Sequence, residues 1–508
     1  MNSAEPAPDV ILTIDQGTTG TTVLLVDHNG RIVSRGYREI ACSYPLPGWV
    51  EQDAMAIWES SLIAVSDALR SAGGVNLVAV GLTNQRETTI LWEAATGRPV
   101  APAIVWQCRR TTDLCDSLRR RGLGDAISDR TGLVVDPYFS GTKIRWLLES
   151  DPSIAERAGR GELRFGTVDS WLLWNLTGGS VHRTDHTNAS RTLLFNIFEK
   201  RWDAFLLDAL EIPSSLLPEV GASRSIHGHT NAIDLPNGQV IPPGIPIGGI
   251  AGDQQAALFG QACFYPGMAK CTYGTGAFLL LNNGPNPVRS RHGLLTTLAC
   301  GPTGEPVFAA EGSIFVAGAA IQWLRDQLGI IESSSESEQL ASELTDNAGV
   351  YLIPAFTGLG APYWDPNARG AIVGLTRGVG RGHLARAALE AIAYQTRDVV
   401  DAMVADGGLT IRELRIDGGA AANNFLAQFQ SDILGAPVLR PTNTETTAMG
   451  SAYLAGLATG FWGSAAEIDR LWQVDRRFTP EMSPDRRRQL YSGWQEAVGR
   501  VRTERVGV

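Results

Sequence analysis

The stretch DQGTTG, residues 15–20, places a carboxylate, two hydroxyls and two glycines directly after an apolar run. Backbone amides of a glycine-containing turn can converge on phosphate oxygens, to which Thr18 and Thr19 add hydroxyl donors. The carboxylate of Asp15 can hold Mg²⁺ directly or through water. The alternative is a plain hairpin that uses glycine and threonine only for its turn geometry, and a single turn of this kind favours that alternative.

A second glycine turn, TYGTG at residues 272–276, shifts the balance toward a nucleotide site. It places Thr275 between two glycines, again after a strand-like run. Two such turns fit a nucleoside triphosphate held between two phosphate-binding loops. A third glycine element, DGG at residues 417–419, lies between a predicted strand and a predicted helix. Gly419 can allow the backbone to approach a ligand closely. It can equally serve only a tight connection between strand and helix, and both interpretations stay open.

The stretch GIAGDQQAAL, residues 249–258, places Asp253 and Gln254 after a glycine-rich apolar run, where a helix is predicted to begin. Phosphoryl transfer to an alcohol needs a group that accepts the hydroxyl proton, and a carboxylate is the usual choice. Asp253 is therefore the candidate base. The alternative is that Asp253 only caps the following helix.

The stretch TNQRETT, residues 83–89, follows another predicted buried strand and contains Arg86 and Glu87. At the carboxyl end of a central strand these groups can bind hydroxyls of a ligand, whereas a surface ion pair is the commoner explanation of neighbouring charges. Trp106, Tyr138 and Phe278 are core aromatics in the simplest interpretation. The chain has neither a GxGxxG nor a GxxxxGK[ST] motif, so dinucleotide-binding and P-loop folds are not indicated.

The elements expected to position these residues occur twice along the chain. Residues 10–14, 21–26 and 31–37 read as strands, followed by a helix from about Asp53 to Gly73 and a strand at residues 76–83. The second copy has strands at 269–273, 277–281, 295–300 and 306–310, a turn at 282–284, and a helix from Ile314 to Leu328. The duplication predicts two related α/β domains, residues 1–259 and 260–508, with facing glycine turns.

Composition excludes several classes of protein. A hydrophobic content of 44%, a charged content of 19% and a net charge of −10 indicate a soluble globular protein that does not bind nucleic acid. Six scattered cysteines suit a reducing compartment. The N-terminus lacks the pattern of a secretory signal, and no apolar run approaches the roughly 20 residues of a membrane span. We therefore expect a cytoplasmic protein with no membrane insertion.

Taken together, these motifs resemble the FGGY family of carbohydrate kinases, in particular its bacterial members that phosphorylate glycerol. The resemblance runs from Ile11 to about Trp462. It also includes IVWQCRRT (104–111), YFSGTKIRWLLE (138–149), IPAFTGLGAPYWDP (353–366) and GAIVGLTRGVGRGHLARAALE (370–390). It implies an actin-like ATPase fold in which two ribonuclease-H-like α/β domains flank a nucleotide cleft.

The resemblance also implies an activity, ATP-dependent phosphorylation of glycerol to sn-glycerol 3-phosphate, and a role for each candidate residue. The glycerol-binding residues would be Arg86, Glu87, Trp106, Tyr138, Asp253, Gln254 and Phe278, with Asp253 as the base. The nucleotide-binding residues would be Thr18, Thr19, Gly20, Thr275, Gly318, Gln322, Gly419 and Asn423. Mg²⁺ would be positioned by Asp15 and Asp253. Kinases of this family are often dimers or tetramers, which makes a homo-oligomer the expectation.

Two departures from the family pattern bear on function. Thr22 stands where similar enzymes commonly have an arginine, so one cationic phosphate contact is missing. Residues 232–243 contain no Arg or Lys, which predicts that fructose 1,6-bisphosphate does not inhibit the enzyme. Two alternatives stay open: a kinase of the same family for another polyol or sugar such as xylulose, and a non-catalytic actin-like ATP-binding switch.

Overall fold

The computed structural model describes residues 7–503, which divide into two compact units. The first unit consists of the chain up to Phe264, Thr297–Phe308 and Thr446–Leu471. The second consists of Tyr265–Thr296, Ala309–Glu445 and the chain from Trp472 onward. The predicted boundary after residue 259 lies near the first change of unit. The return of two later segments to the first unit was not anticipated from the sequence.

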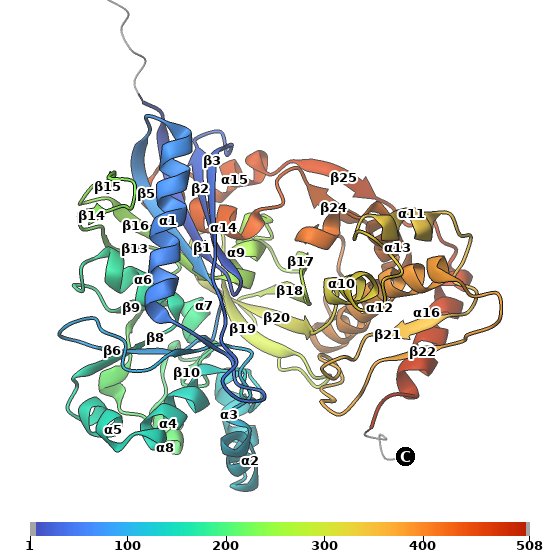
Figure 1. Cartoon of the computed structure of the whole chain (residues 1–508), viewed down its shortest axis with the longest axis horizontal. Helices are drawn as coiled ribbons and strands as arrows, with labels where there is room; N and C mark the ends of the chain where they lie inside the picture. Colours follow the sequence, from blue (N-terminus) through green and yellow to red (C-terminus); the bar gives the residue numbers. More distant parts are fainter. Residues whose placement is uncertain (1–6, 504–508) are drawn as a thin grey trace, which may run out of the picture. The chain divides into compact units, whose positions relative to one another are not determined.

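The first unit is built on a six-stranded sheet (Figure 1). In spatial order its strands are β3 (Ile32–Glu39), β2 (Gly20–Asp27), β1 (Asp9–Gln16), β5 (Asn76–Asn84), β16 (Pro246–Gly252) and β13 (Arg224–His229). β1, β2 and β3 are antiparallel, whereas β1, β5 and β16 are parallel neighbours. The carboxyl ends of three parallel strands therefore lie at one edge of the sheet, where open α/β sheets place ligand-binding residues.

Helices cover both faces of this sheet. α1 (Ala54–Ala72) begins after its predicted cap Asp53 and ends at Gly73, as the sequence predicts. α14 (Thr446–Thr459) packs against β1, β5 and β16. Gly81 of β5 makes this packing possible, because an added Cβ would lie 2.4 Å from the backbone oxygen of Ser451 in α14. The late segment that contains α14 is thus part of the core of the first unit.

The second unit repeats this plan in a seven-stranded sheet. In spatial order its strands are β19 (Leu295–Cys300), β20 (Pro306–Ile314), β18 (Ala277–Gly284), β17 (Ala269–Tyr273), β23 (Leu414–Asp417), β24 (Val438–Pro441) and β25 (Val474–Phe478). β17 is antiparallel to β18 and parallel to β23, and β24 is parallel to β23 and antiparallel to β25. β1, with its neighbours, has the same pattern of directions, so the duplication predicted from the sequence is confirmed.

The principal helices of the second unit are α10 (Gly318–Asp326), α11 (Glu336–Ser342), α12 (Arg381–Gly407), α13 (Asn424–Leu434) and α16 (Pro484–Gly499). Two local predictions here are wrong. Residues 282–284 continue strand β18 instead of forming a turn. Ile314 ends β20 and Phe315 lies between β20 and α10, so neither belongs to the predicted helix. In both cases the strand continues beyond the residue at which the sequence pattern predicts its end.

The smaller elements complete the chain. In the first unit they are β4 (Glu51–Gln52), β6 (Ile90–Glu93), β7 (Ala103–Ile104), α2 (Thr112–Arg120), α3 (Gly124–Thr131), α4 (Ser140–Ser150), α5 (Pro152–Gly159), β8 (Leu163–Gly166), α6 (Val168–Leu176), β9 (Arg183–Asp185), α7 (His186–Ala189), β10 (Phe195–Asn196), β11 (Arg201–Trp202), α8 (Ala204–Leu210), β12 (Glu219–Gly221), β14 (Ile233–Asp234), β15 (Val240–Ile241), α9 (Asp253–Gly260) and α15 (Ala465–Leu471). In the second unit they are β21 (Tyr351–Ile353) and β22 (Ala371–Val373). Within residues 7–503, none of the helices has the length and apolar character needed to span a bilayer.

Candidate active site

The candidate residues of the first unit follow its three parallel strands. The turn from Gly17 to Gly20 follows β1, Arg86 and Glu87 follow β5, and Asp253 begins α9 directly after β16. Because the three strands are parallel neighbours, these residues meet at one edge of the sheet. The structure therefore brings these residues of the first unit together at one edge of its sheet.

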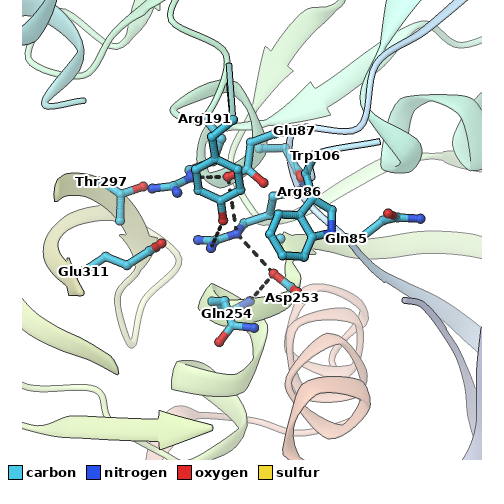
Figure 2. Close-up of polar contacts among 12 residues, drawn as sticks. Gln85, Arg86, Glu87, Trp106, Arg191, Asp253, Gln254, Thr297 and Glu311 are labelled. Atoms are coloured by element: carbon cyan, nitrogen blue, oxygen red, sulfur yellow. Dashed lines mark hydrogen bonds and ion pairs between the residues drawn. The ribbon is translucent and has the colours of Figure 1, made fainter. Parts of the chain in front are cut away.

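Arg86 and Glu87 are not a surface ion pair. Their side chains are 2% and 1% exposed, and Arg86 Nε lies 3.8 Å from Glu87 Oε1 and 3.1 Å from Asp253 Oδ1. Figure 2 shows Arg86 between these two carboxylates. A buried guanidinium between two carboxylates keeps both acids oriented, because its donors have fixed directions. The surface interpretation of these charges is therefore wrong.

A second buried arginine, Arg191, contacts the same oxygen of Glu87 as Arg86 does. Its Nε donates to Glu87 Oε1 at 2.7 Å, and its side chain is fully buried. The guanidinium carbon also lies 5.5 Å from the ring centroid of Tyr138 and 5.3 Å from that of Phe139. Glu87 itself has a φ of 61°, a left-handed conformation that non-glycine residues rarely adopt. Such backbone strain is typical of functional positions.

Asp253 is the first residue of α9, and the cap of this helix is Gly252. Its Oδ1 accepts from the backbone N of Gln254 at 2.7 Å, so Asp253 does satisfy one amide of the helix, but the same oxygen also pairs with the buried Arg86. Both contacts use Oδ1, and the side chain is 30% exposed. Among the described residues Oδ2 has no hydrogen-bond partner and can accept a proton. Gln254 beside it is buried.

Trp106 and Tyr138 lie edge to face, with ring centroids 5.5 Å apart, and both are half-buried. Their polar atoms face the candidate residues: Arg86 Nη2 donates to Tyr138 Oη at 3.4 Å, and Trp106 Nε1 donates to Thr18 Oγ1 at 2.8 Å. Neither ring is enclosed in the core, so the core-aromatic interpretation does not hold for them. Phe278 lies on β18 of the second unit and is also half-buried.

The turn after β1 is closed by a hydrogen bond of 2.9 Å from Gly17 N to Gly20 O. Within it Thr18 is half-buried and Thr19 is exposed, as hydroxyls that meet a ligand must be. Three buried glutamines fix this turn from behind. Gln85 Nε2 donates to Gln16 at 3.0 Å and to Gln52 at 2.8 Å, and Gln52 Nε2 donates to the carbonyl of Thr18 at 2.7 Å. Asp15, half-buried, lies at the end of β1 next to this turn.

Lys143 of α4 lies beneath Tyr138 and is fully buried. Its Nζ donates to the carbonyl oxygens of Tyr138 and Phe139. Burial lowers the pKa of Lys143 to about 8, because desolvation disfavours the charged amine. The nearby Glu87 acts in the opposite direction and raises it. Lys143 therefore supports the backbone that carries Tyr138.

The candidate residues of the second unit gather at the carboxyl ends of β17 and β23. The carbonyl of Gly274 accepts from Gly318 N at 3.0 Å, which joins the Thr275 turn to the start of α10. Gly418 packs against the backbone of Tyr273, and Gly419 beyond it is exposed. Asn423 caps α13 through its side chain and is half-buried. Gln322 lies one turn into α10 and is exposed. These backbone amides and polar groups fit an anionic or planar ligand.

The donor set of the site fits one kind of metal binding and not another. Among the described residues no group of three or more His, Cys, Asp or Glu could hold a metal ion. Tightly caged metals such as structural zinc need such a group, whereas Mg²⁺ usually takes one or two carboxylates and completes its shell with phosphates and water. Asp15, near the end of β1, and Asp253, directly after β16, fit this second kind of binding.

The fold and these residues define a kinase that transfers a phosphoryl group to a carbohydrate or polyol. The chain belongs to the FGGY family of carbohydrate kinases: the family's N-terminal domain matches residues 10–260, and its C-terminal domain matches residues 269–459. The expected actin-like ATPase fold is thereby confirmed, and the chain is a kinase.

Named relatives cover nearly the whole chain. A glycerol kinase from Petrotoga mobilis is 56% identical over 495 residues, which are 97% of this chain and 98% of that one. A glycerol kinase from Shewanella oneidensis is likewise 56% identical, over 97% of this chain and 99% of the other. The solved structure of Plasmodium falciparum glycerol kinase with ADP has a TM-score of 0.92 and 36% identity, covering 99% of this chain and 100% of that chain. A gluconate kinase from Lactobacillus acidophilus, 20% identical with a TM-score of 0.85 and coverage of 97% and 98%, shares the fold.

Sequence reasoning missed several residues that the structure brings to this site: Gln16, Tyr37, Gln52, Gln85, Lys143 and Arg191. One signal was available for two of them. Lys143 and Arg191 lie in the polar runs SGTK and TNASR, and polar runs that turn out to be buried must be paired. Gln16 and Gln85 lie within the stretches DQGTTG and TNQRETT, but glutamines are common on surfaces, so nothing in the sequence pairs them with each other or with Gln52.

Proposed function

We propose that this chain transfers the γ-phosphoryl group of ATP to a terminal hydroxyl of glycerol, giving sn-glycerol 3-phosphate and ADP. The observation that carries this proposal is the placement of Asp253 beside Arg86, Glu87 and Tyr138 at one edge of the sheet. The high identity to named glycerol kinases supports the same substrate. The Plasmodium falciparum glycerol kinase, whose structure was solved with ADP, supports an adenine nucleotide as the phosphoryl donor.

On the acceptor side, buried charges would bind the hydroxyls of glycerol and aromatic rings would pack against its carbons. Arg86 supplies donors and Glu87 an acceptor, both held rigidly by the buried ion pairs. Trp106 supplies an apolar face, and we propose that Phe278 does the same from the second unit. Gln254 and Tyr138 would complete the hydroxyl contacts. Each hydroxyl of a bound polyol loses its water and then needs a hydrogen-bond partner from the protein. The polar groups of this site could supply those partners for a small polyol.

On the nucleotide side, Thr18, Thr19, Gly20 and Thr275 would contact phosphates. Gly318, Gln322, Gly419 and Asn423 would line the rest of the nucleotide site. Asp15 and Asp253 would hold Mg²⁺, which when bound neutralises charge on the transferring phosphate. Two carboxylates are enough, since phosphates and water supply the other ligands.

In the mechanism, the residues of this chain orient the alcohol and accept its proton. Arg86 fixes Oδ1 of Asp253, so the other oxygen, Oδ2, takes the proton of the attacking hydroxyl. The hydroxyl oxygen forms a bond to the γ-phosphorus as the bond between that phosphorus and the bridging oxygen of ADP breaks. Amides and hydroxyls of the two glycine turns stabilise the charge on the phosphate oxygens.

Formation of ADP, measured with and without glycerol at several Mg²⁺ concentrations, tests the proposal. We expect turnover that depends on both, with sn-glycerol 3-phosphate as the product. A panel of xylulose, gluconate and other polyols addresses the main rival. Preference for a pentulose would replace glycerol as the substrate, and ADP formation that no alcohol stimulates would favour the ATP-binding switch.

Three further properties belong to the proposal. Residues 232–243, which include the small hairpin of β14 and β15, carry no Arg or Lys, so fructose 1,6-bisphosphate should not inhibit turnover. We propose a homo-oligomer, dimer or tetramer, and a cytoplasmic location. Turnover with and without the bisphosphate, light scattering and cell fractionation test these three statements in turn.

A further inference from the structure

Tyr37 lies against the glycine turn that follows β1. An added Cβ on Gly20 would stand 2.6 Å from the Tyr37 hydroxyl oxygen and 2.7 Å from two atoms of its ring. The hydroxyl of Tyr37 therefore occupies the space that a side chain at residue 20 would fill. Gly20 lacks a positive φ, so no backbone conformation requires glycine there. The ring of Tyr37 accounts for the glycine instead.

Tyr37 also shares a face of the sheet with Asp15. Thr22 of β2 pairs with Asp15 of β1 on one side and with Tyr37 of β3 on the other. Directly paired residues in antiparallel strands point to the same face, so these three side chains form one row. The row ends at the carboxylate proposed to hold Mg²⁺.

The hydroxyl of Tyr37 is accessible and oriented. The residue is 44% exposed, and its hydroxyl makes no hydrogen bond to any other residue within 7–503. The guanidinium of Arg35, two residues earlier on β3, stacks on the ring at 5.7 Å from its centroid. The ring therefore contacts Arg35 and Gly20, and its hydroxyl is left available to a ligand.

One pocket contains both the turn and this tyrosine. Its lining includes Thr19, Tyr37, Glu39, Ile40 and Ala41. Glu39 is the acidic member, and its charge opposes an anion there. A phosphate in this pocket would need donors to offset that repulsion, and the Tyr37 hydroxyl is placed to be one.

We propose that Tyr37 is a nucleotide-binding residue whose hydroxyl donates to a phosphate oxygen of ATP. It supplies from β3 a side-chain donor beside Gly20, which has no side chain of its own. The proposal rests on the proposed function, since it takes ATP as the ligand of the turn. It assigns the tyrosine to the phosphates and to no other part of the nucleotide. Its chemistry is that of a neutral donor, which also fits the lack of a cation at Thr22.

The substitution Tyr37→Phe tests this directly, because it removes the hydroxyl and keeps the ring against Gly20. We expect the KM for MgATP to rise about tenfold, the loss expected for one hydrogen bond to a charged group. The kcat and the KM for glycerol should stay within about twofold. Tyr44→Phe, at a tyrosine that is 72% exposed, is the matched control. An unchanged KM for MgATP in Tyr37→Phe would overturn the proposal.

Two more variants separate a phosphate contact from a structural effect. Glu39→Gln removes the opposing charge, so the KM for MgATP should fall, and a rise would contradict a phosphate in this pocket. Tyr37→Ala should bind MgATP weakly. Adding Gly20→Ser to it places a hydroxyl in the vacated space and should recover most of the loss. Failure of this rescue, with both proteins folded by circular dichroism, would count against the proposal.

Calorimetry keeps this proposal distinct from the proposed function. Tyr37→Phe should weaken binding of MgATP and leave binding of adenosine unchanged. This comparison needs no alcohol and no turnover. If the wild-type protein binds MgATP but does not phosphorylate glycerol, the substrate assignment fails and the Tyr37 proposal is still tested. Equal weakening for adenosine and MgATP would refute a contact with phosphate.

Discussion

The indole Nε1 of Trp106 donates a hydrogen bond of 2.8 Å to the hydroxyl oxygen of Thr18. This bond joins the aromatic residue that would pack against the alcohol to the turn that would bind the phosphates. The Thr18 carbonyl is in turn held by Gln52. The two halves of the reaction are thus linked within the first unit by side chains whose positions are mutually fixed.

Trp106→Phe tests this link, because it keeps an aromatic face and removes the indole donor. We expect the KM for MgATP to rise about 2- to 10-fold, the effect of one neutral hydrogen bond on the orientation of Thr18. The KM for glycerol should change less, since the ring still covers the carbons. Steady-state kinetics with each substrate varied measures both. A larger effect on glycerol than on MgATP would contradict the link.

Arg191 should act on glycerol binding through Glu87. Arg191→Met removes the 2.7 Å contact with Glu87 Oε1, and we expect the KM for glycerol to rise at least tenfold. Leaving a buried carboxylate with one partner fewer also destabilises the fold, by roughly 3 to 5 kcal/mol, so unfolding must be measured alongside. Arg191→Lys keeps the charge but not the planar donors. Its KM for glycerol should therefore lie between that of the wild-type protein and that of Arg191→Met.

A double-mutant cycle shows whether Arg191 acts through Glu87 or only through packing. In a Glu87→Gln background, Arg191→Met should add little to the KM for glycerol, because the ion pair is already lost. Additive effects of the two substitutions would contradict the positioning role. A purely structural role would lower the midpoint of unfolding without this coupling.

Lys143 should make stability depend on pH in the alkaline range. Its pKa is about 8 in the folded protein and 10.5 in the reference state, so the unfolded chain binds more protons between these values. The free energy of unfolding contributed by this residue therefore rises as pH increases from about 8 to 10.5, by roughly 3 kcal/mol in total. Below pH 8 both states are protonated and the contribution is constant.

Lys143→Met should remove this rise, which denaturant unfolding at pH 7 to 10 can measure. The variant should also raise the KM for glycerol, because the Tyr138 and Phe139 carbonyls lose their donor. Arg164→Met, at a half-buried cation elsewhere in the same unit, is a control for the loss of a positive charge. An alkaline rise that persists in Lys143→Met would show that another group causes it.

The sheet and much of the first-unit site could be predicted from the sequence for local reasons. β1 and α1 carry strong signals, a continuous apolar run and a helix bounded by Asp53 and Gly73. Asp253, Arg86 and Glu87 could be grouped because each follows a buried strand, and parallel strands end at the same edge. The duplicated glycine turns then predicted the second unit.

The parts that could not be predicted depend on contacts between distant segments. Arg191 lies about a hundred positions from Glu87 in the chain, and no local pattern pairs them. α14 joins the first unit because Gly81 admits its backbone, a relation that one sequence does not display. Tyr37 reads as an ordinary strand residue until its ring is seen to cover Gly20. Tertiary packing, and not local propensity, decided all three.

Asp253→Asn is the most direct test of the central claim, that this carboxylate accepts the proton of the alcohol. The amide keeps an oxygen for the Gln254 N–H but cannot take a proton. Asp234→Asn, at an exposed aspartate of β14, is the matched control. With glycerol and MgATP saturating, we predict that kcat falls by about 10² to 10⁴ in Asp253→Asn and stays at the wild-type value in Asp234→Asn, with the fraction of folded protein checked by denaturant unfolding. A kcat close to that of the wild-type protein would contradict the account.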